Sequence, residues 1–333
     1  MPITATIDPK IQQQAEPVLQ EVLKGVGEAN QKAEREREEA ILKNREIIGQ
    51  RLETDGRKLI AYIARVGPEN SAVSTDDIAP FGSMLSSLGD FTDLDLMIHS
   101  PGGNGVVAEK LVEMCRSSCK GKFRVIVPNM AKSAATLIAL GADEVVMGYC
   151  SELGPIDPQK LIVAGGRIQQ VSAQSIISAR DMLMEQIQTA RSQGKDITGY
   201  QQQLASSTMD PAFIFECQKE VDFAIDLVKK CLPNRMLKIK FPSKKPSWRK
   251  TKAEEIAKNL TSTDQRFIHG RMIGPKECAA LGLNVTELER DNEYWKNLFE
   301  LYVRAEVLMS IRSGPNSVVA KLFTDAHTHL LVT

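Results

Sequence analysis

Long hydrophobic runs and an excess of charge of either sign are both absent from this sequence of 333 residues. No apolar run approaches the roughly 20 residues that a membrane-spanning helix requires. Lysine plus arginine and aspartate plus glutamate each total 42, so no overall field would attract nucleic acid or an anionic membrane surface. The first residues, "MPITATIDPKIQQQAEP", lack the basic and apolar regions of a signal peptide. These absences predict a protein that is not exported and does not bind nucleic acid.

Closely spaced metal ligands are also scarce. The six cysteines are scattered, at positions 115, 119, 150, 217, 231 and 278. Cys115 and Cys119 could share one helix face, but no second close pair completes a metal site. His327 and His329, in "DAHTH" with Asp325, have no third ligand close to them in the sequence. We therefore expect free thiols in a reducing cytoplasm, and neither a metal nor another cofactor.

Composition divides the chain into four parts. Residues 1–57 form a charged N-terminal arm, in which "QKAEREREEAILKNREIIGQRLE" has strong helix formers and no proline. We expect a long exposed helix there, either packed on a partner chain or simply solvated. Residues 58–165 are expected to form an α/β core with the candidate active site, residues 166–292 a helical extension that completes this domain, and residues 293–333 a C-terminal helix and tail.

Short apolar strands alternate with helical segments in the expected core. The strands are predicted in "KLIAYIARV", "DLDLMIHS", "KFRVIVPN" and "EVVMGYC", and the helices in "STDDIAPFGSMLSSL", "GVVAEKLVEMCRSS" and "SAATLIALGA". This alternation predicts an α/β fold with a parallel sheet and right-handed crossovers. After about residue 165 the strand pattern ends, and apolar residues recur at helical spacing.

The stretch "HSPGGNG", residues 99–105, follows one of the predicted strands. Ligand sites in parallel sheets gather at the carboxyl ends of strands. Two adjacent glycines let the backbone turn sharply and bring its N–H groups close to a substrate. In acyl transfer such N–H groups stabilise an oxyanion, by about 3 kcal/mol per donor. The alternative is a tight strand-to-helix turn without a catalytic role.

A lone serine, Ser133, stands where a short loop meets a helix in "VPNMAKSAATLIALGADEV". A helix N-terminus offers free N–H groups and positive potential, which suits a nucleophile, although Ser133 could equally be a helix cap. Ser133 follows Gly103 by thirty residues, about one helix and one strand. Neighbouring parallel strands would place both residues at one sheet edge, where the N–H groups of Gly103 and Ala134 could form one oxyanion hole.

Three motifs in order, "SPGGNGVVAEKL", "VPNMAKSAATLIALGADEVVMG" and "LGPIDPQ", resemble those of the Clp-fold serine proteases. This family includes the ClpP peptidase and signal peptide peptidase A, and the resemblance is greatest to the serine dehydrogenase proteinase (SDH) group. It covers residues 58–165 well. The segment "HGRMIGPKECAALGLNV" extends it more weakly over residues 250–287.

The resemblance implies a ClpP/crotonase-like superhelix of ββα units, here with a long N-terminal helix and additional C-terminal helices. It also implies that Ser133 is the nucleophile and that Gly103 and Ala134 are the backbone donors of the oxyanion hole. Gly102 and Asn104, in the same turn, would contact the substrate. Such proteins assemble into homo-oligomers, as trimers or larger trimer-based rings.

The general base departs from the family pattern. "LGPIDPQK" lacks the histidine of ClpP, and residues 173–185 lack the lysine of peptidase A, whose place falls near Ser178 or Arg180. Arginine stays protonated and cannot accept the proton. The remaining candidates are Lys160, which we assign as the catalytic base, and three alternatives: Lys132, His99 and His269.

The sequence thus predicts a serine endopeptidase that acts on a peptide or protein, with Ser133 as nucleophile and Lys160 as base. One alternative is an inactive Clp-fold scaffold or peptide-binding subunit. Another is a crotonase-type acyl-CoA enzyme, whose carboxylate would come from a set without diagnostic spacing: Asp143, Glu144, Glu152 and Asp157. No ATPase or membrane-protein partner is identified by the sequence.

Overall fold

The computed structural model describes residues 9–54, 56–164, 166–204, 210–261, 271–313 and 318–333. Its centre is a seven-stranded mixed sheet with the strand order β11-β10-β1-β2-β3-β5-β9. The strands are β1 (Arg57–Ala64), β2 (Asp93–His99), β3 (Phe123–Val127), β5 (Glu144–Gly148), β9 (Val285–Leu288), β10 (Lys321–Thr324) and β11 (His329–Val332). Five neighbouring strands pair in parallel, namely β1, β2, β3, β5 and β9. Strand β10 pairs antiparallel with β1, and β11 pairs antiparallel with β10. The predicted α/β class and the four predicted core strands are confirmed.

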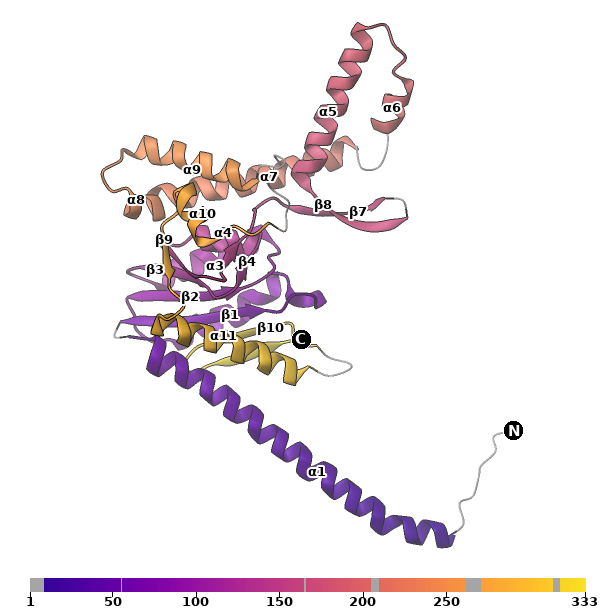
Figure 1. Ribbon diagram of the computed structural model, residues 1–333, viewed down its shortest axis with the longest axis vertical. Helices are drawn as coiled ribbons and strands as arrows, with labels where there is room; N and C mark the ends of the chain where they lie inside the picture. Colours follow the sequence, from indigo (N-terminus) through magenta and orange to yellow (C-terminus); the bar gives the residue numbers. More distant parts are fainter. Residues whose placement is uncertain (1–8, 55, 165, 205–209, 262–270, 314–317) are drawn as a thin grey trace.

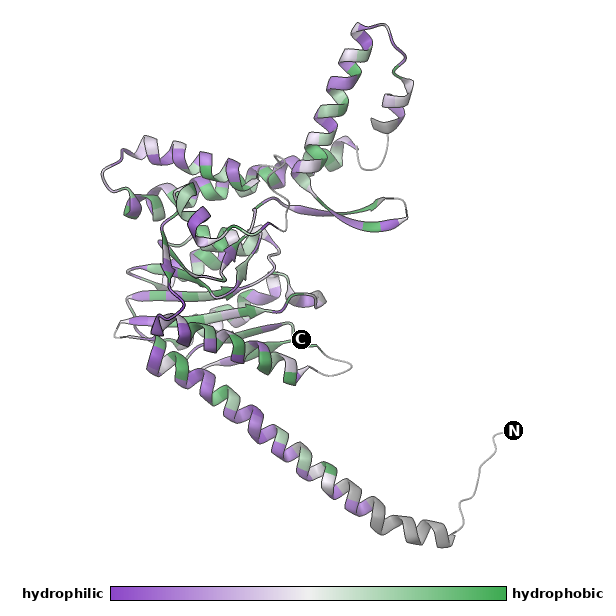
Figure 2. Ribbon diagram, viewed as in Figure 1, coloured by the Kyte–Doolittle hydropathy of each residue, from purple (hydrophilic) through white to green (hydrophobic). Residues whose placement is uncertain are grey.

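Both faces of this sheet are buried, which explains why its strands are apolar runs rather than alternating ones. In β1, Ile60 and Tyr62 point into one hydrophobic cluster, and Leu59 and Ile63 point into another on the opposite face. Figure 2 shows the apolar residues concentrated in these central strands and in the helix surfaces that cover them.

Helices cover each face. The first face packs against α2 (Ile78–Ser87), α3 (Gly105–Ser118) and α4 (Ala134–Leu140). The second face packs against α11 (Glu293–Arg312) and a π-helical turn, Ile47–Leu52. That turn ends α1 (Pro9–Glu46), which projects away from the body (Figure 1). The predicted long N-terminal helix is therefore present, and the side chains of residues 24–29 in it are exposed.

A second, smaller sheet layer stands beside the carboxyl ends of β2 and β3. It consists of β4 (Met130–Ala131) paired with β6 (Glu152–Leu153). Single bridges extend it from Ala131 to Ser100 and from Leu153 to Ile273. This layer brings the three sequence motifs into one place, because each motif contributes a strand or a bridge to it.

A segment that begins at residue 159 projects from the body, with an antiparallel hairpin and the helix after it extending outward (Figure 1). The hairpin is formed by β7 (Gln159–Ala164) and β8 (Arg167–Ser172). The expectation that strands end near residue 165 is therefore wrong: most of β8 is exposed, so its sequence carries no pattern of burial. The helices that follow are α5 (Ala173–Ser192), α6 (Thr198–Leu204), α7 (Pro211–Cys231), α8 (Met236–Lys240), α9 (Pro246–Thr261) and α10 (Pro275–Leu281).

Two further expectations can be compared with the structure. All six cysteines are free thiols, as predicted. In the part of the chain that the structure describes, no helix has the length and hydropathy to cross a membrane.

Candidate active site

Ser133 lies between β4 and α4 in an unusual backbone conformation. Its φ of 48° and ψ of −115° make it the one non-glycine residue with positive φ among the described residues. Such a conformation costs about 1–3 kcal/mol and persists where surrounding structure imposes it, often at functional sites. Ser133 occupies the N-cap position of α4, but its side chain makes no capping hydrogen bond. The capping interpretation therefore does not explain this serine.

The Pro-Gly-Gly turn packs directly against Ser133. A β-carbon on Gly102 would stand 2.7 Å from the β-carbon of Ser133. Backbone hydrogen bonds hold the two segments together: Ser100 N–H donates to the Met130 carbonyl, and Lys132 N–H donates to the Ser100 carbonyl, both at 3.1 Å. The structure thus brings together the two stretches that the sequence separates by thirty residues.

The N–H groups of Gly103 and Ala134 are both available for a ligand. Val73 N–H donates to the Gly102 carbonyl at 2.7 Å, and Asn104 N–H donates to the Val73 carbonyl at 2.8 Å. In this parallel bridge Gly103 lies between the two bonded groups, so its own N–H points away from Val73. Ala134 is the first residue of α4, and the N–H of a first helical residue has no partner inside the helix.

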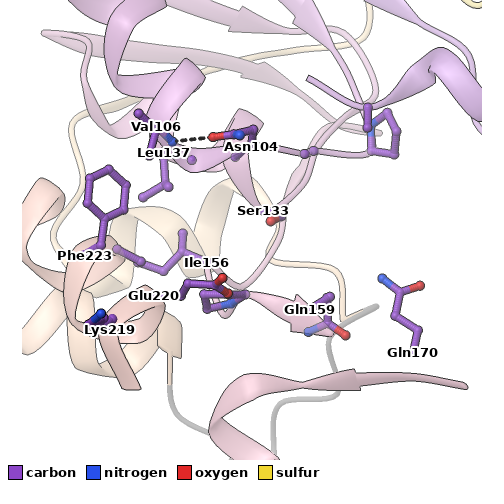
Figure 3. A pocket seen from close by; sticks show the side chains of 18 residues that line it. Asn104, Val106, Ser133, Leu137, Ile156, Gln159, Gln170, Lys219, Glu220 and Phe223 are labelled. Carbon is purple, nitrogen blue, oxygen red and sulfur yellow. Dashed lines mark hydrogen bonds between the residues drawn. The ribbon is translucent and has the colours of Figure 1, made fainter. Parts of the chain in front are cut away.

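A cavity of about 720 Å³ opens beside Ser133. Figure 3 shows the Ser133 hydroxyl between residues of α7 on one side, Phe223 and Glu220, and the hairpin residues Gln159 and Gln170 on the other. The cavity is lined by the predicted turn and serine, Gly102, Gly103, Asn104, Ser133 and Ala134, and by Leu137, Ile156 and Pro158. Its volume suits a peptide segment or a small ligand.

Asn104 has a structural contact as well as a place in the cavity wall. Its Oδ1 accepts hydrogen bonds from Val106 N–H at 2.9 Å and Val107 N–H at 3.2 Å. Asn104 is therefore the N-cap of α3, which fixes the direction in which the chain leaves the glycine turn.

Lys160, the predicted base, lies at the start of β7 and forms an ion pair with Glu220 of α7. The distance from Lys160 Nζ to Glu220 Oε1 is 2.5 Å. Lys160 is not among the residues that line the cavity, whereas Glu220 is. Lys160 Nζ is therefore engaged by Glu220 and would have to leave this partner before it could reach Ser133.

The other candidate bases are held elsewhere. Lys132 Nζ lies 2.7 Å from Glu152 Oε1 and donates to the carbonyl of Arg271 at 3.1 Å, so it points away from the hydroxyl, as we expect for a neighbour on a turn. His99 is buried against the Tyr302 ring. Burial lowers the pKa of His99 to about 4.

His269 lies outside the described residues. Arg180 pairs with Asp181 on α5, away from the residues that line the cavity. Within the described part of the chain, no group of three or more histidine, cysteine, aspartate or glutamate side chains could hold a metal ion.

The carboxylates considered for crotonase chemistry are all engaged by other groups. Asp143 pairs with Arg116, Glu144 with Lys122, Glu152 with Lys132, and Asp157 accepts from Gln159. None of the four lines the cavity.

Sequence reasoning missed the contribution of α7. Lys219, Glu220 and Phe223 form one wall of the cavity, although they follow Ser133 by about ninety residues. Lys219 Nζ lies 4.7 Å from the centre of the Phe215 ring and 2.9 Å from Glu216 Oε1. Among the described residues that line the cavity, Glu220 is the one with a carboxylate side chain. Its spacing to Ser133 carries no local signal in the sequence.

Comparison with known proteins adds weak overall likeness to several solved structures. One is a mutant of the 1510-N membrane-bound stomatin-specific protease, at 12% identity and a TM-score of 0.39, covering 74% of this chain and 86% of that one. A second is a mutant ClpP1 from Listeria monocytogenes, at 9% identity and a TM-score of 0.31, covering 73% and 94%. A third is a probable enoyl-CoA hydratase/isomerase from Mycobacterium abscessus, at 12% identity and a TM-score of 0.34, covering 78% of each chain.

Two sequence relatives come from Methanocaldococcus jannaschii, and both bear the description "uncharacterized protein". MJ0137 is 30% identical over 209 residues, which are 63% of this chain and 58% of MJ0137. MJ1495 is 28% identical over 209 residues, which are 63% of this chain and 56% of MJ1495. The chain thus spans less than three fifths of the length of these two relatives.

A family described as ClpP-like SDH-type serine proteinase matches residues 84–198. This segment contains the glycine turn, Ser133 and the hairpin. The resemblance inferred from the motifs is therefore confirmed: the segment that carries the glycine turn and Ser133 matches the ClpP-like SDH-type serine proteinases.

Proposed function

We propose that this protein is a Clp-fold serine endopeptidase with Ser133 as its nucleophile. The Ser133 hydroxyl would attack a peptide carbonyl, and the N–H groups of Gly103 and Ala134 would hold the resulting oxyanion. Collapse of this intermediate would expel the amine and leave an acyl group on Ser133, which water then hydrolyses. The observation that carries the proposal is the strained Ser133 packed on the glycine turn at the wall of a cavity.

Lys160 is our candidate for the general base. Its Nζ lies 2.5 Å from Glu220 Oε1, and Glu220 lines the cavity, so the amine stands behind one residue of the cavity wall. Access to Ser133 requires the ion pair with Glu220 to open. A peptide that enters between the hairpin and α7 would meet this ion pair, and its contacts would offset the cost of separating the two charges.

The substrate would be a peptide or protein segment that contacts Gly102 and Asn104 in the turn. The apolar part of the wall, which includes Leu137, Ile156 and Phe223, suits an apolar side chain next to the cleaved bond. We further propose a homo-oligomer, in keeping with the trimer-based rings that the family resemblance implies.

Peptide hydrolysis tests this proposal. The full chain and its Ser133→Ala variant would be incubated with a mixed-sequence peptide library, and cleavage sites read by mass spectrometry. The Ser192→Ala variant, altered at an exposed position near the end of α5, is the matched control. We expect cleavage by the wild type and the control, and none by Ser133→Ala. Equal cleavage by all three proteins would refute the role of Ser133.

The second candidate function is a peptide-binding or scaffold subunit without catalysis. The ion pair between Lys160 and Glu220 favours it, because the amine of the candidate base is engaged by a carboxylate and not by Ser133. In this case a peptide would bind in the cavity with equal affinity in the wild type and in Ser133→Ala, and no cleavage would occur in either.

A further inference from the structure

A buried ion pair joins β10 to the segment that supports the glycine turn. Lys321 begins β10 and Asp77 ends the short turn Thr75–Asp77 before α2. The Lys321 Nζ lies 2.6 Å from Asp77 Oδ1, and their side chains are 2% and 0% exposed. Charges this deeply buried are costly unless they are paired and hydrogen-bonded. Their contacts therefore indicate what the pair supports.

One chain of contacts leads from Asp77 to Gly103. Asp77 Oδ2 accepts a hydrogen bond from Ser74 N–H at 2.8 Å. Ser74 follows Val73 in the chain. The Val73 N–H donates to the Gly102 carbonyl, and the Val73 carbonyl accepts from Asn104 N–H, so Val73 is bonded on both sides of Gly103. Gly103 is also pressed against this segment, since a β-carbon on it would lie 2.5 Å from the Val73 carbonyl oxygen. The position of Val73 thus sets the position of the Gly103 N–H.

A second chain leads from Asp77 toward Gly102. The Tyr62 hydroxyl donates to Asp77 Oδ2 at 3.1 Å. Tyr62 lies opposite Ile98 in the neighbouring parallel strand, and Ser100, two residues after Ile98, faces the same side. Ser100 Oγ in turn accepts from Gly102 N–H at 3.1 Å. Asp77 is therefore linked to the Gly103 side of the turn through Ser74 and Val73, and its other contact, Tyr62, stands beside Ser100, which accepts from Gly102.

We propose that Lys321 and Asp77 are positioning residues for the oxyanion hole. Lys321 Nζ pairs with Asp77 Oδ1, and Asp77 Oδ2 accepts from Ser74 N–H and the Tyr62 hydroxyl. These bonds fix the glycine turn relative to Ser133. The proposal rests on the proposed peptidase function and extends the active-site assembly to β10. That strand lies outside the segment 84–198 that matches the proteinase family.

The test combines the labelling rate of Ser133 with hydrogen exchange of the glycine turn in the full chain. A fluorophosphonate probe would be used on the wild type, Lys321→Met and Tyr62→Phe. Arg116→Met is the matched control, because it also removes a largely buried ion pair, Arg116–Asp143, at 2.7 Å, but one that holds the start of β5. Tyr62→Phe removes only the hydroxyl that donates to Asp77, and it provides the test if Lys321→Met fails to fold.

We expect Lys321→Met and Tyr62→Phe to label Ser133 at least about 10-fold more slowly, because a misplaced oxyanion donor loses much of its effect. The Arg116→Met control should remain within about threefold of the wild type. The backbone N–H of Asn104 donates to the Val73 carbonyl. Its hydrogen should exchange faster with solvent in the two test variants than in the wild type, and at the wild-type rate in the control.

Unchanged labelling and unchanged exchange in Tyr62→Phe and in folded Lys321→Met would overturn the positioning role. If the wild type itself does not label, the proposed peptidase function fails, and hydrogen exchange alone decides the positioning role. Faster exchange at Asn104 in the test variants would then still support it, and equal exchange in all proteins would overturn it.

Discussion

Gly102 is packed so closely on Ser133 that no side chain fits between them. A β-carbon on Gly102 would lie 2.7 Å from the Ser133 β-carbon and 2.6 Å from the Lys132 carbonyl oxygen. The turn and the serine can therefore approach each other only with glycine at this position, and this approach places the N–H of Gly103 and the Ser133 hydroxyl at the same cavity.

Gly102→Ala should therefore abolish catalysis. The methyl group would push the turn away from Ser133 and displace the oxyanion donor, and we expect labelling by a fluorophosphonate to fall by about 100-fold or more. Gly67→Ala is the control. The φ of Gly67, 114°, is close to the 104° of Gly102, but a β-carbon on Gly67 would have no atom within 4 Å. This variant should lose about 1 kcal/mol of stability through backbone strain and keep its labelling rate. Equal rates in both variants would contradict the proposed contact.

The ion pair between Lys160 and Glu220 gives a prediction about the base. Lys160→Met should lower peptide hydrolysis by about 100-fold or more, since a general base contributes that much or more. Glu220→Gln should match or exceed the wild-type rate, because it releases Lys160 from its carboxylate. Lys229→Met, on the same helix as Glu220 but paired with Asp226 at the surface, is the control. Wild-type activity in Lys160→Met would mean that another group takes the proton.

Phe223 should set the preference for the substrate side chain. It stands in the cavity wall close to Gly105 and Leu137, so Phe223→Ala would remove apolar contact area. We expect KM for peptides with a large apolar residue at the cleavage site to rise by about tenfold, with a small effect on kcat. Phe215→Ala, an exposed phenylalanine of the same helix, should leave both constants unchanged. An equal effect of the two substitutions would argue against this wall as a binding surface.

The buried histidine His99 should make stability depend on pH. Burial lowers the pKa of His99 from 6.5 to about 4, so the unfolded chain binds the proton more readily than the folded one. Its contribution is therefore fully present above about pH 6.5 and is lost as the pH falls toward 4. The loss should be about 3 kcal/mol in the free energy of unfolding.

Chemical denaturation at a series of pH values would measure this loss. His99→Asn should flatten the pH dependence, because an amide oxygen can still accept from Met130 N–H without titrating. His327→Asn, at an exposed position, is the control and should behave like the wild type. A slope that persists in His99→Asn would assign it to other groups, among them His329, whose pKa burial also lowers to about 4.

Local patterns revealed the motifs of the candidate site because each depends on residues close in sequence. The glycine turn, Ser133 and the four core strands follow from short runs whose glycines or apolar residues have a direct structural meaning. The structure adds the strained backbone of Ser133, which no local pattern encodes.

The parts that the sequence did not predict depend on long-range contacts. Phe223 and Glu220 reach the cavity through the packing of α7, and the exposed strand β8 lacks a burial pattern. No strand is predicted in the C-terminal tail, although Lys321 stands within the apolar run "VVAKLF". A lysine inside such a run is a signal of a buried charge with a distant partner, which the structure identifies as Asp77.

The most direct test of the central claim is the site of covalent modification. The full chain would be treated with diisopropyl fluorophosphate, and the adduct located by intact-mass measurement and peptide mapping. Our account predicts one phosphoryl adduct per chain, on the peptide that contains Ser133, and none in Ser133→Ala. The absence of an adduct in the wild type, or an adduct that persists in Ser133→Ala, would contradict it.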